Sequence, residues 1–167
     1  GFWSALTIAT TQALPLLFYI EDNGYGISVT SDYQTPGQDI AANLASFKNL
    51  AIWKGDGTEP EQAARMMGEA VGHVRTRKGP ALIRLTVPRL QGHSFQDTQT
   101  YKSDAFVQSE WARDPLPKLK SYLVGALMDE GEWDAIQAEA EAAVDAARAE
   151  AEGRGVSSPE SVTSHVF

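Results

Sequence analysis

Two short polar segments hold the residue types that could do chemistry in this sequence. The first spans residues 21–28 and reads Glu-Asp-Asn-Gly-Tyr-Gly-Ile-Ser. Its Asn23 offers a neutral side-chain oxygen, and a turn flanked by glycines can point backbone carbonyls and amides at one spot. Oxygen ligands of this kind suit a hard cation such as Mg²⁺, which is usually shared with phosphate groups. The Asn-Gly pair is also typical of a tight turn without a ligand, so the residues alone leave both interpretations open.

The second polar segment spans residues 88–97 and contains Arg89, His93, Ser94 and Asp97. An arginine guanidinium can bind phosphate oxygens through two parallel hydrogen bonds. A loop histidine can donate to a reacting group, or exchange protons with it, near neutral pH. Ser94 and Asp97 could satisfy the loop or orient the imidazole. The alternative is a polar surface loop with an incidental histidine.

The spacing of apolar residues predicts strands and helices that alternate over the N-terminal part of the chain. The predicted strands cover 16–20, 50–53 and 81–87, and the predicted helices cover 1–12, 39–47 and a segment from a Thr58–Glu61 capping box to Lys78. This alternation indicates an α/β fold with a parallel sheet and helices on its faces. In such sheets, ligands bind outside the carboxyl ends of the strands. We therefore expect the two polar segments to meet at one edge of the sheet.

The C-terminal part of the chain is predicted to be helical. The expected helices cover 106–111, 116–127 and 133–151, and the last of them is rich in Ala and Glu. The sequence thus divides into an α/β part, residues 1–103, and a helical C-terminal extension of the same domain, residues 104–167.

The composition argues against several classes of function. Fourteen Lys and Arg residues against 22 Asp and Glu residues give a formal charge of −8, so neither nucleic acid nor a membrane surface is an expected partner. The absence of cysteine excludes disulfides, thiolate zinc sites and a cysteine nucleophile. No apolar run approaches the roughly 20 residues that span a bilayer. The chain begins at Gly1 inside a helical pattern and without an initiator methionine, so we expect it to be a piece of a longer protein.

Together, the two polar segments resemble a known enzyme family. Residues 17–28 are similar to the second half of the thiamine diphosphate motif, in which a Gly-Asp-Gly precedes a strand that ends in Asn-Asn or Asp-Asn. Residues 79–101 resemble the strand and loop of the alpha subunit of the first, decarboxylating component of 2-oxo acid dehydrogenase complexes that act on pyruvate or branched-chain 2-oxo acids. The order and separation of the two segments make the resemblance specific. It implies a doubly wound, mostly parallel sheet of the thiamine diphosphate-binding fold.

The resemblance implies individual roles for the residues of both segments. Asn23 matches a side-chain ligand of Mg²⁺, and Tyr25 matches a residue whose backbone carbonyl binds the same ion. Ile27 matches an apolar wedge that holds the two rings of the cofactor in a bent conformation. Arg89 matches a diphosphate-binding arginine. His93 matches a catalytic loop histidine near the reacting carbon, which assists the intermediates and acyl transfer.

Two further positions complete the comparison. Ser94 falls in the same cofactor-binding loop, at a position that is phosphorylated in mitochondrial relatives. The Gly-Asp-Gly, whose Asp is the other protein ligand of the metal, should precede Phe2 and is therefore not in the sequence. Gly55-Asp56-Gly57 follows Asn23 instead of preceding it, so this tripeptide is not a substitute.

The implied activity is that of an oxidoreductase that depends on thiamine diphosphate and Mg²⁺. It would decarboxylate a 2-oxo acid and transfer the acyl group to a lipoyl carrier. A beta subunit, or a fused beta segment, would supply the glutamate that activates the cofactor, and a lipoyl-bearing acyltransferase would be a second partner. The segment alone is expected to be inactive, and its location is expected to be cytoplasmic, with a mitochondrial origin left open. Two alternatives remain: an acetoin dehydrogenase or transketolase-like enzyme, and a non-catalytic assembly module with a degenerate cofactor site.

Overall fold

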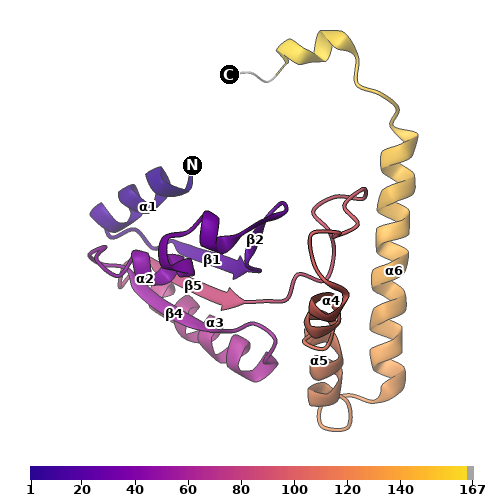
Figure 1. Cartoon of the computed structure of the whole chain (residues 1–167), viewed down its shortest axis with the longest axis horizontal. Coiled ribbons are helices and arrows are strands. Elements are labelled where there is room, and N and C mark those ends of the chain that lie inside the picture. The colour runs from indigo at the N-terminus through magenta and orange to yellow at the C-terminus, as the bar shows by residue number, and fades with distance from the viewer. Residues whose placement is uncertain (165–167) are drawn as a thin grey trace. The chain divides into compact units, whose positions relative to one another are not determined.

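The computed structural model describes residues 1–164 and divides the chain into two compact units. The first unit covers residues 1–122, and the second begins at Leu123. The first unit contains the sheet and the helices that pack against it (Figure 1). Residues 104–122 group with this unit, and the domain division predicted at residue 103 stays a prediction. The last three residues of the predicted C-terminal extension lie outside the described residues.

Helices and strands alternate along the first unit. Two 3₁₀ turns, Ser31–Tyr33 and Pro36–Gln38, connect the third strand to the second helix. The helices and strands are α1 (Phe2–Thr11), β1 (Leu17–Asp22), β2 (Tyr25–Gly26), β3 (Val29–Thr30), α2 (Ile40–Asn43), β4 (Ala51–Asp56), α3 (Pro60–Arg75), β5 (Ala81–Thr86), α4 (Asp104–Trp111) and α5 (Pro115–Leu123).

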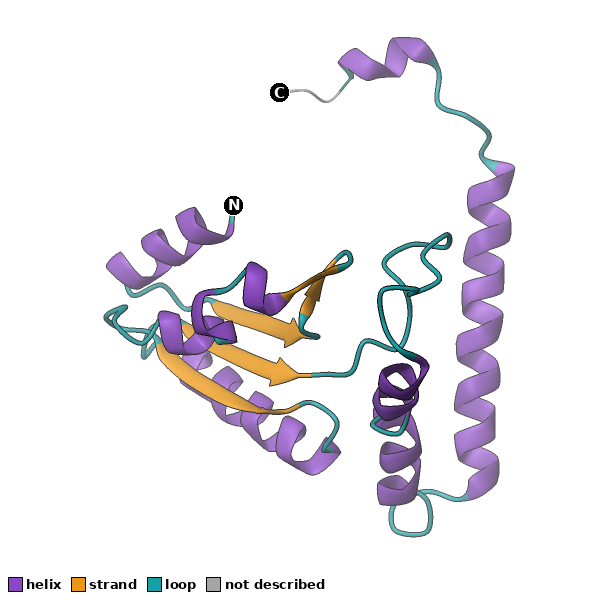
Figure 2. Ribbon diagram, in the orientation of Figure 1, coloured by secondary structure: helices purple, strands orange, loops and turns teal. Residues whose placement is uncertain are grey.

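Three strands form a parallel sheet in the order β1-β5-β4. Thr86, the last residue of the central strand β5, is in register with Asp22 of β1 and Asp56 of β4. The arrows of β1 and β5 accordingly point the same way in Figure 2. The loops that follow the strands therefore leave from one edge of the sheet. This confirms the predicted α/β fold with a parallel sheet, while the doubly wound arrangement stays a prediction.

Helices cover both faces of the sheet. Successive side chains of β5 point to opposite faces, so this strand contributes to an apolar cluster on each face. The cluster on the α3 face consists of Met66, Ala70, Ala81, Ile83 and Leu85. The cluster on the face covered by α1 and α2 consists of Leu6, Ala41, Leu44 and Leu82. Burial on both faces explains why β5 reads as a nearly continuous apolar run.

The start of α3 differs from the prediction. The helix begins at Pro60, and its N-cap Glu59 makes no side-chain capping bond, so the predicted Thr58–Glu61 capping box is wrong. Thr58 is fully buried, and its hydroxyl donates to Asp56 Oδ1 at 2.8 Å. Proline is favoured at the first helical position because its φ already suits the helix and its missing N–H would have no partner there. Pro60 therefore sets the start of α3.

The chain between β1 and α2 contains a small hairpin. β2 and β3 pair antiparallel, with Tyr25 opposite Thr30 and Gly26 opposite Val29. The chain leaves β1 through Gly24, whose φ of +75° is readily adopted by glycine. Ile27 lies in the turn between β2 and β3.

The second unit contains the long helix α6 (Glu130–Gly153), which includes the helix predicted over 133–151. A capping box formed by Asp129 and Glu132 begins it. The helix predicted over 116–127 instead ends at Leu123, and beyond it Gly125 turns the chain with a φ of +88°. A 3₁₀ turn follows at Pro159–Thr163. Within residues 1–164, no helix combines the length and the apolar character needed to cross a membrane.

Leu82 and Ile83 are adjacent in sequence but belong to different clusters, so truncating them should have independent effects on stability. We expect Leu82→Ala to lower the free energy of unfolding of the full-length protein by about 2–5 kcal/mol, and Ile83→Val to lower it by about 0.5–1.5 kcal/mol. The double variant should lose the sum to within about 0.5 kcal/mol. Denaturant unfolding measures all three values, and a loss well beyond the sum would show that both faces behave as one core.

Candidate functional site

The side chains of Asp22 and Asn23 lie next to each other at the end of β1, and that of Asp22 has a structural role. Asp22 Oδ2 accepts from Arg84 Nε at 2.7 Å, and Asp22 Oδ1 accepts from the N–H of Gly24 at 3.1 Å. Arg84 comes from β5, and both side chains of this ion pair are mostly buried. The ion pair satisfies the Asp22 carboxylate and ties the end of β1 to β5. Asn23 is therefore the better placed of the two to meet a ligand.

The amide oxygen of Asn23 has one hydrogen-bond partner among the described residues. Asn23 Oδ1 accepts from the N–H of Tyr25 at 3.0 Å, and an amide oxygen has a second lone pair that can bind a cation. Asn23 lines two pockets of about 410 and 350 Å³, one beside Glu21 and Phe2 and the other beside Thr86. Residues 1–164 contain no group of three or more His, Asp or Glu side chains that could hold a metal.

Ile27, at the tip of the hairpin, has an unusual backbone conformation. Its φ is +58°, which is disfavoured for a β-branched residue, and its side chain is 60% exposed. The carbonyl of Ile27 accepts from Arg89 Nη1 and, at 3.4 Å, from the hydroxyl of Tyr101. Strained residues persist where the surrounding structure holds them in place, and they cluster at functional sites. Arg89 and Tyr101, which both follow β5, therefore hold Ile27 in its conformation.

Arg89 is buried between the two loops. Beyond the bond to Ile27, its guanidinium donates to Asp97 Oδ2 at 3.3 Å and to the carbonyl of Gln91 at 3.4 Å. The guanidinium carbon lies 5.5 Å from the centre of the Tyr25 ring, which is within cation–π range. Three of its five N–H donors thus have partners in the chain. Arg89 joins the loop after β5 to the turn that carries Asn23 and Tyr25.

Asp97 organises the loop after β5 by accepting several hydrogen bonds. Its Oδ2 accepts from the N–H of His93 at 2.7 Å and from the hydroxyl of Tyr101 at 3.0 Å, and its Oδ1 accepts from the N–H of Gln99 at 2.9 Å. The two backbone N–H donors lower the pKa of Asp97, and Tyr101 and Arg89 lower it further. A Cβ on Gly92 would lie 2.1 Å from the carbonyl oxygen of Asp97. The loop therefore needs glycine at position 92.

The structure brings some of the predicted site residues together and leaves others apart. Tyr25, Ile27 and Arg89 are in mutual contact near the turn that carries Asn23. His93 and Ser94 lie on the exposed part of the loop. His93 is attached to the loop through its backbone N–H and not through its ring.

A buried ion pair contacts the backbone of Arg89. The ammonium of Lys102 and the carboxylate of Glu110 bind each other, and the side chain of Lys102 has no exposed surface. Lys102 Nζ also lies 4.9 Å from the centre of the Tyr25 ring. Burial raises the pKa of Tyr25, and the charge of Glu110 raises it further. The Tyr25 ring therefore stays neutral and contacts two cations, those of Lys102 and Arg89.

Glu110 is the residue of this arrangement that sequence reasoning missed. The available signal was its position in a short helix among Phe106, Val107 and Trp111, where a charged side chain falls close to apolar neighbours. A charge in such a position is buried only when it has a partner. The sequence pattern does not identify that partner.

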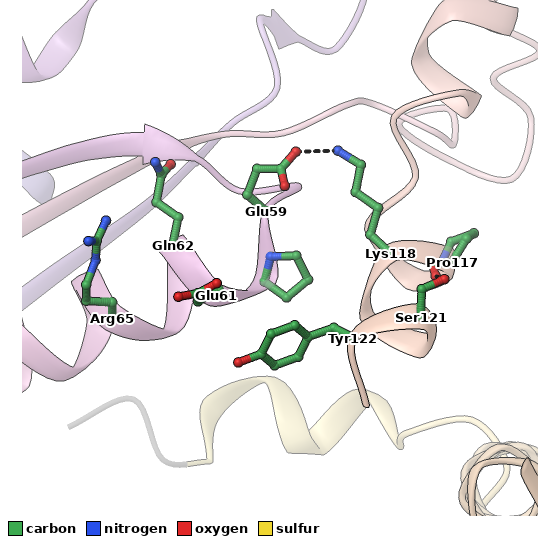
Figure 3. Close-up of a pocket in the computed structure, with 9 residues that line it drawn as sticks. Glu59, Glu61, Gln62, Arg65, Pro117, Lys118, Ser121 and Tyr122 are labelled. Atoms are coloured by element: carbon green, nitrogen blue, oxygen red, sulfur yellow. Dashed lines mark hydrogen bonds and ion pairs between the residues drawn. The ribbon is translucent and has the colours of Figure 1, made fainter. Parts of the chain in front are cut away.

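A separate pocket of about 690 Å³ lies between the first turn of α3 and α5 (Figure 3). Glu59, Glu61, Arg65 and Lys118 contribute charges of both signs to its lining, and Lys118 binds Glu59 at 2.6 Å. None of the predicted site residues lines it. Asn23 instead lines the two smaller pockets.

Comparison with known proteins identifies the family. The sequence matches the dehydrogenase E1 component family over residues 1–160. The chain belongs to this family. The match covers both site segments and nearly all of the helical part of this E1 component chain.

Curated relatives include alpha subunits of three differently named enzymes. The chain is 28% identical to the alpha subunit of acetoin:2,6-dichlorophenolindophenol oxidoreductase from Cupriavidus necator, over 99% of the chain and 50% of that relative. It is 30% identical to the alpha subunit of 2-oxoisovalerate dehydrogenase from Bacillus subtilis, over 99% of the chain and 51% of the relative. It is 27% identical to the alpha subunit of the pyruvate dehydrogenase E1 component from Rhizobium meliloti, over 72% of the chain and 35% of the relative. The E1 component chain thus spans about half the length, or less, of the curated relatives it matches.

The strain at Ile27 can be tested by substitution in the full-length protein. Asparagine tolerates positive φ, whereas the left-handed conformation costs most other residues roughly 1–2 kcal/mol. We expect Ile27→Asn to raise the free energy of unfolding by about 1 kcal/mol, because the side chain is largely exposed and little packing is lost. Val29→Asn, in the same hairpin but outside the set of residues with positive φ, is the matched control and should give no gain. Equal effects of the two substitutions in denaturant unfolding would show that Ile27 is not strained.

The hydrogen bonds to Asp97 make the order of the loop dependent on pH. Because the folded pKa of Asp97 lies below its ordinary value of 3.8, its contribution is fully present above that value and is lost as pH falls through the lowered pKa. We expect the amides of residues 89–101 to stay protected from hydrogen exchange as pH falls to about 4, and to lose protection at lower pH. Asp97→Asn should lower this protection already at neutral pH, whereas Asp104→Asn should not. Unchanged protection in the Asp97 variant would contradict the role given to this carboxylate.

Proposed function

We propose that this chain is the diphosphate-binding part of the alpha subunit of a thiamine diphosphate- and Mg²⁺-dependent 2-oxo acid dehydrogenase. The observation that carries the proposal is the bond between the Arg89 guanidinium and the Ile27 carbonyl, which joins the two predicted site segments at the carboxyl edge of the sheet. Membership of the dehydrogenase E1 component family supports the same assignment. The proposed fold is the doubly wound thiamine diphosphate-binding fold, of which this chain holds three parallel strands.

The donor set beside β1 fits a magnesium diphosphate. Asn23 has an amide oxygen with a free lone pair, and it faces a pocket that Glu21 also lines. Mg²⁺ is usually bound by one or two protein oxygens, and phosphates and water complete its shell. We assign Asn23 Oδ1 and the backbone carbonyl of Tyr25 as its ligands in this chain, and Arg89 as the cation nearest to the diphosphate. The two N–H groups of Arg89 without a partner among residues 1–164 are available for phosphate oxygens.

When bound, thiamine diphosphate supplies the nucleophile and the electron sink that decarboxylation of a 2-oxo acid requires. The exposed side chain of Ile27 is proposed to contact the cofactor as an apolar wedge, held in place by the two donors to its carbonyl. His93 is proposed to move a proton at the reacting centre during acyl transfer to a lipoyl group. Ser94 is proposed to complete the loop around the cofactor. The exposure of both side chains leaves them accessible to substrate.

The remaining parts of the site are proposed to come from partners. A beta subunit, or a fused beta segment, would supply the glutamate that activates the cofactor, and a lipoyl-bearing acyltransferase would take up the acyl group. The chain offers no Gly-Asp-Gly before Asn23. We therefore expect little thiamine diphosphate binding and no turnover by this segment alone.

The metal assignment can be tested by Asn23→Ala in the full-length enzyme with its partner subunit. Loss of the amide oxygen should raise the dissociation constant for thiamine diphosphate in the presence of Mg²⁺ by about tenfold or more, measured by calorimetric titration. Asn43→Ala, which removes an exposed amide bonded to Pro36, is the control and should leave binding unchanged. In the same titration His93→Ala should bind the cofactor normally and lose about 100-fold or more in turnover. Normal binding by the Asn23 variant would count against the metal site.

An assay of the full-length enzyme with a panel of substrates tests which one it uses. The relatives, at 27–30% identity, are named for three different substrates. The full-length enzyme should turn over pyruvate or a branched-chain 2-oxo acid. Turnover of acetoin alone would favour the acetoin dehydrogenase alternative, which the Cupriavidus necator relative supports. Absence of both cofactor binding and turnover would favour a non-catalytic assembly module.

A further inference from the structure

The buried pair formed by Lys102 and Glu110 is unusual in what else it binds. Lys102 Nζ donates to the carbonyl oxygen of Arg89 at 2.9 Å, and Glu110 Oε1 accepts from the N–H of Arg89 at 2.9 Å. Both ends of the ion pair thus bind the main chain of the same residue. The backbone of Arg89 is held on both sides of its Cα by the two charged groups.

The chain just before this point is also restricted. Pro88 precedes Arg89, and its ring fixes its own φ. With the N–H and the carbonyl of Arg89 both bound to buried charges, the direction of its Cα–Cβ bond is fixed. The guanidinium consequently meets the Ile27 carbonyl and the face of the Tyr25 ring. The ion pair therefore acts on the turn after β1 through Arg89.

Tyr25 connects the same ion pair directly to that turn. Its ring centre lies 4.9 Å from Lys102 Nζ and 5.5 Å from the guanidinium carbon of Arg89. Its backbone N–H donates to Asn23 Oδ1. A shift of the Lys102 ammonium would thus change its contacts with both Tyr25 and Arg89, the residues that flank the proposed diphosphate position.

The energetics of a buried ion pair point away from a purely stabilising role. Replacing such a pair by apolar side chains of similar volume is often neutral for stability, or even stabilising, because desolvation offsets the attraction. Removing one partner alone is strongly destabilising, since it leaves an unpaired buried charge. The pair at Lys102 and Glu110, with its two directed bonds to Arg89, is better explained by the position that it gives to Arg89.

We propose that Lys102 and Glu110 are a pair of positioning residues that fix the backbone of Arg89, so that its guanidinium is held ready for the cofactor diphosphate. The proposal rests on the proposed function, because it takes Arg89 as the diphosphate-binding residue. The side chains of Lys102 and Glu110 are both buried, so we assign them a role that acts through Arg89. Their effect should appear in cofactor affinity and not in the chemical step at saturating cofactor.

The test is the double variant Lys102→Met/Glu110→Leu in the full-length enzyme with its partner subunit. It removes both bonds to Arg89 and leaves no unpaired buried charge. We expect the dissociation constant for thiamine diphosphate with Mg²⁺, measured by calorimetry, to rise by about tenfold or more, while kcat at saturating cofactor changes less than about twofold. The single variant Lys102→Arg keeps a cation that can donate to the Arg89 carbonyl, so it should retain most of the wild-type affinity for the cofactor. A double variant with normal affinity, or with lower kcat at unchanged affinity, would overturn the proposal.

Two further variants separate this proposal from the proposed function. Lys118→Met removes another Lys–Glu ion pair of the same unit without contacting Arg89, so it should leave cofactor affinity unchanged. Arg89→Ala should weaken cofactor binding at least as much as the double variant does. If Arg89→Ala has no effect, the assignment of the diphosphate site fails; if Arg89→Ala weakens binding and the double variant does not, only the positioning role fails.

Discussion

The parallel register of β1 and β5 is the constraint on which the candidate site depends. Asp22 and Thr86 end the two strands side by side, so the turn after β1 and the loop after β5 begin at neighbouring points of one sheet edge. An antiparallel pair would have sent them to opposite ends. The register is the reason why Ile27 and Arg89, 62 positions apart in the sequence, share a hydrogen bond. The contacts between the two segments follow from that proximity.

Charge is balanced locally at this edge, although the chain as a whole carries a formal charge of −8. Each of three basic side chains near the turn is paired with at least one carboxylate, and Arg84 also binds Asp39. The pairs are Arg84 with Asp22, Arg89 with Asp97, and Lys102 with Glu110. An isolated diphosphate would meet these carboxylates at a cost, whereas a diphosphate that arrives with Mg²⁺ carries much less net charge. The balanced edge is therefore consistent with the proposal that the cofactor binds as its magnesium complex.

The sequence predicted those features of the fold and site that depend on local pattern, and missed those that depend on contacts between distant segments. Apolar spacing was enough to predict three parallel strands and the meeting of the two polar segments. It placed the start of α3 at Thr58, because it could not foresee that Thr58 would be buried against Asp56. It also gave no partner for Glu110, because the N–H of Arg89 lies 21 positions away. The position of His93 in the loop is set by the carboxylate of Asp97, which binds its backbone N–H and not its ring.

The site combines a rigid part and an accessible part, and this division has a physical advantage. Arg89 is held by its own loop, by Ile27 and by the Lys102–Glu110 pair before any ligand is bound, so little ordering entropy remains to be lost on binding a diphosphate. Donors fixed in this way also need no reorganisation when charge develops beside them. His93 and Ser94, in contrast, lie on the exposed part of the loop, where a large acyl acceptor could reach them. In the proposed site, buried charges thus fix the end that would hold the diphosphate, while the end that would exchange substrates and products stays open.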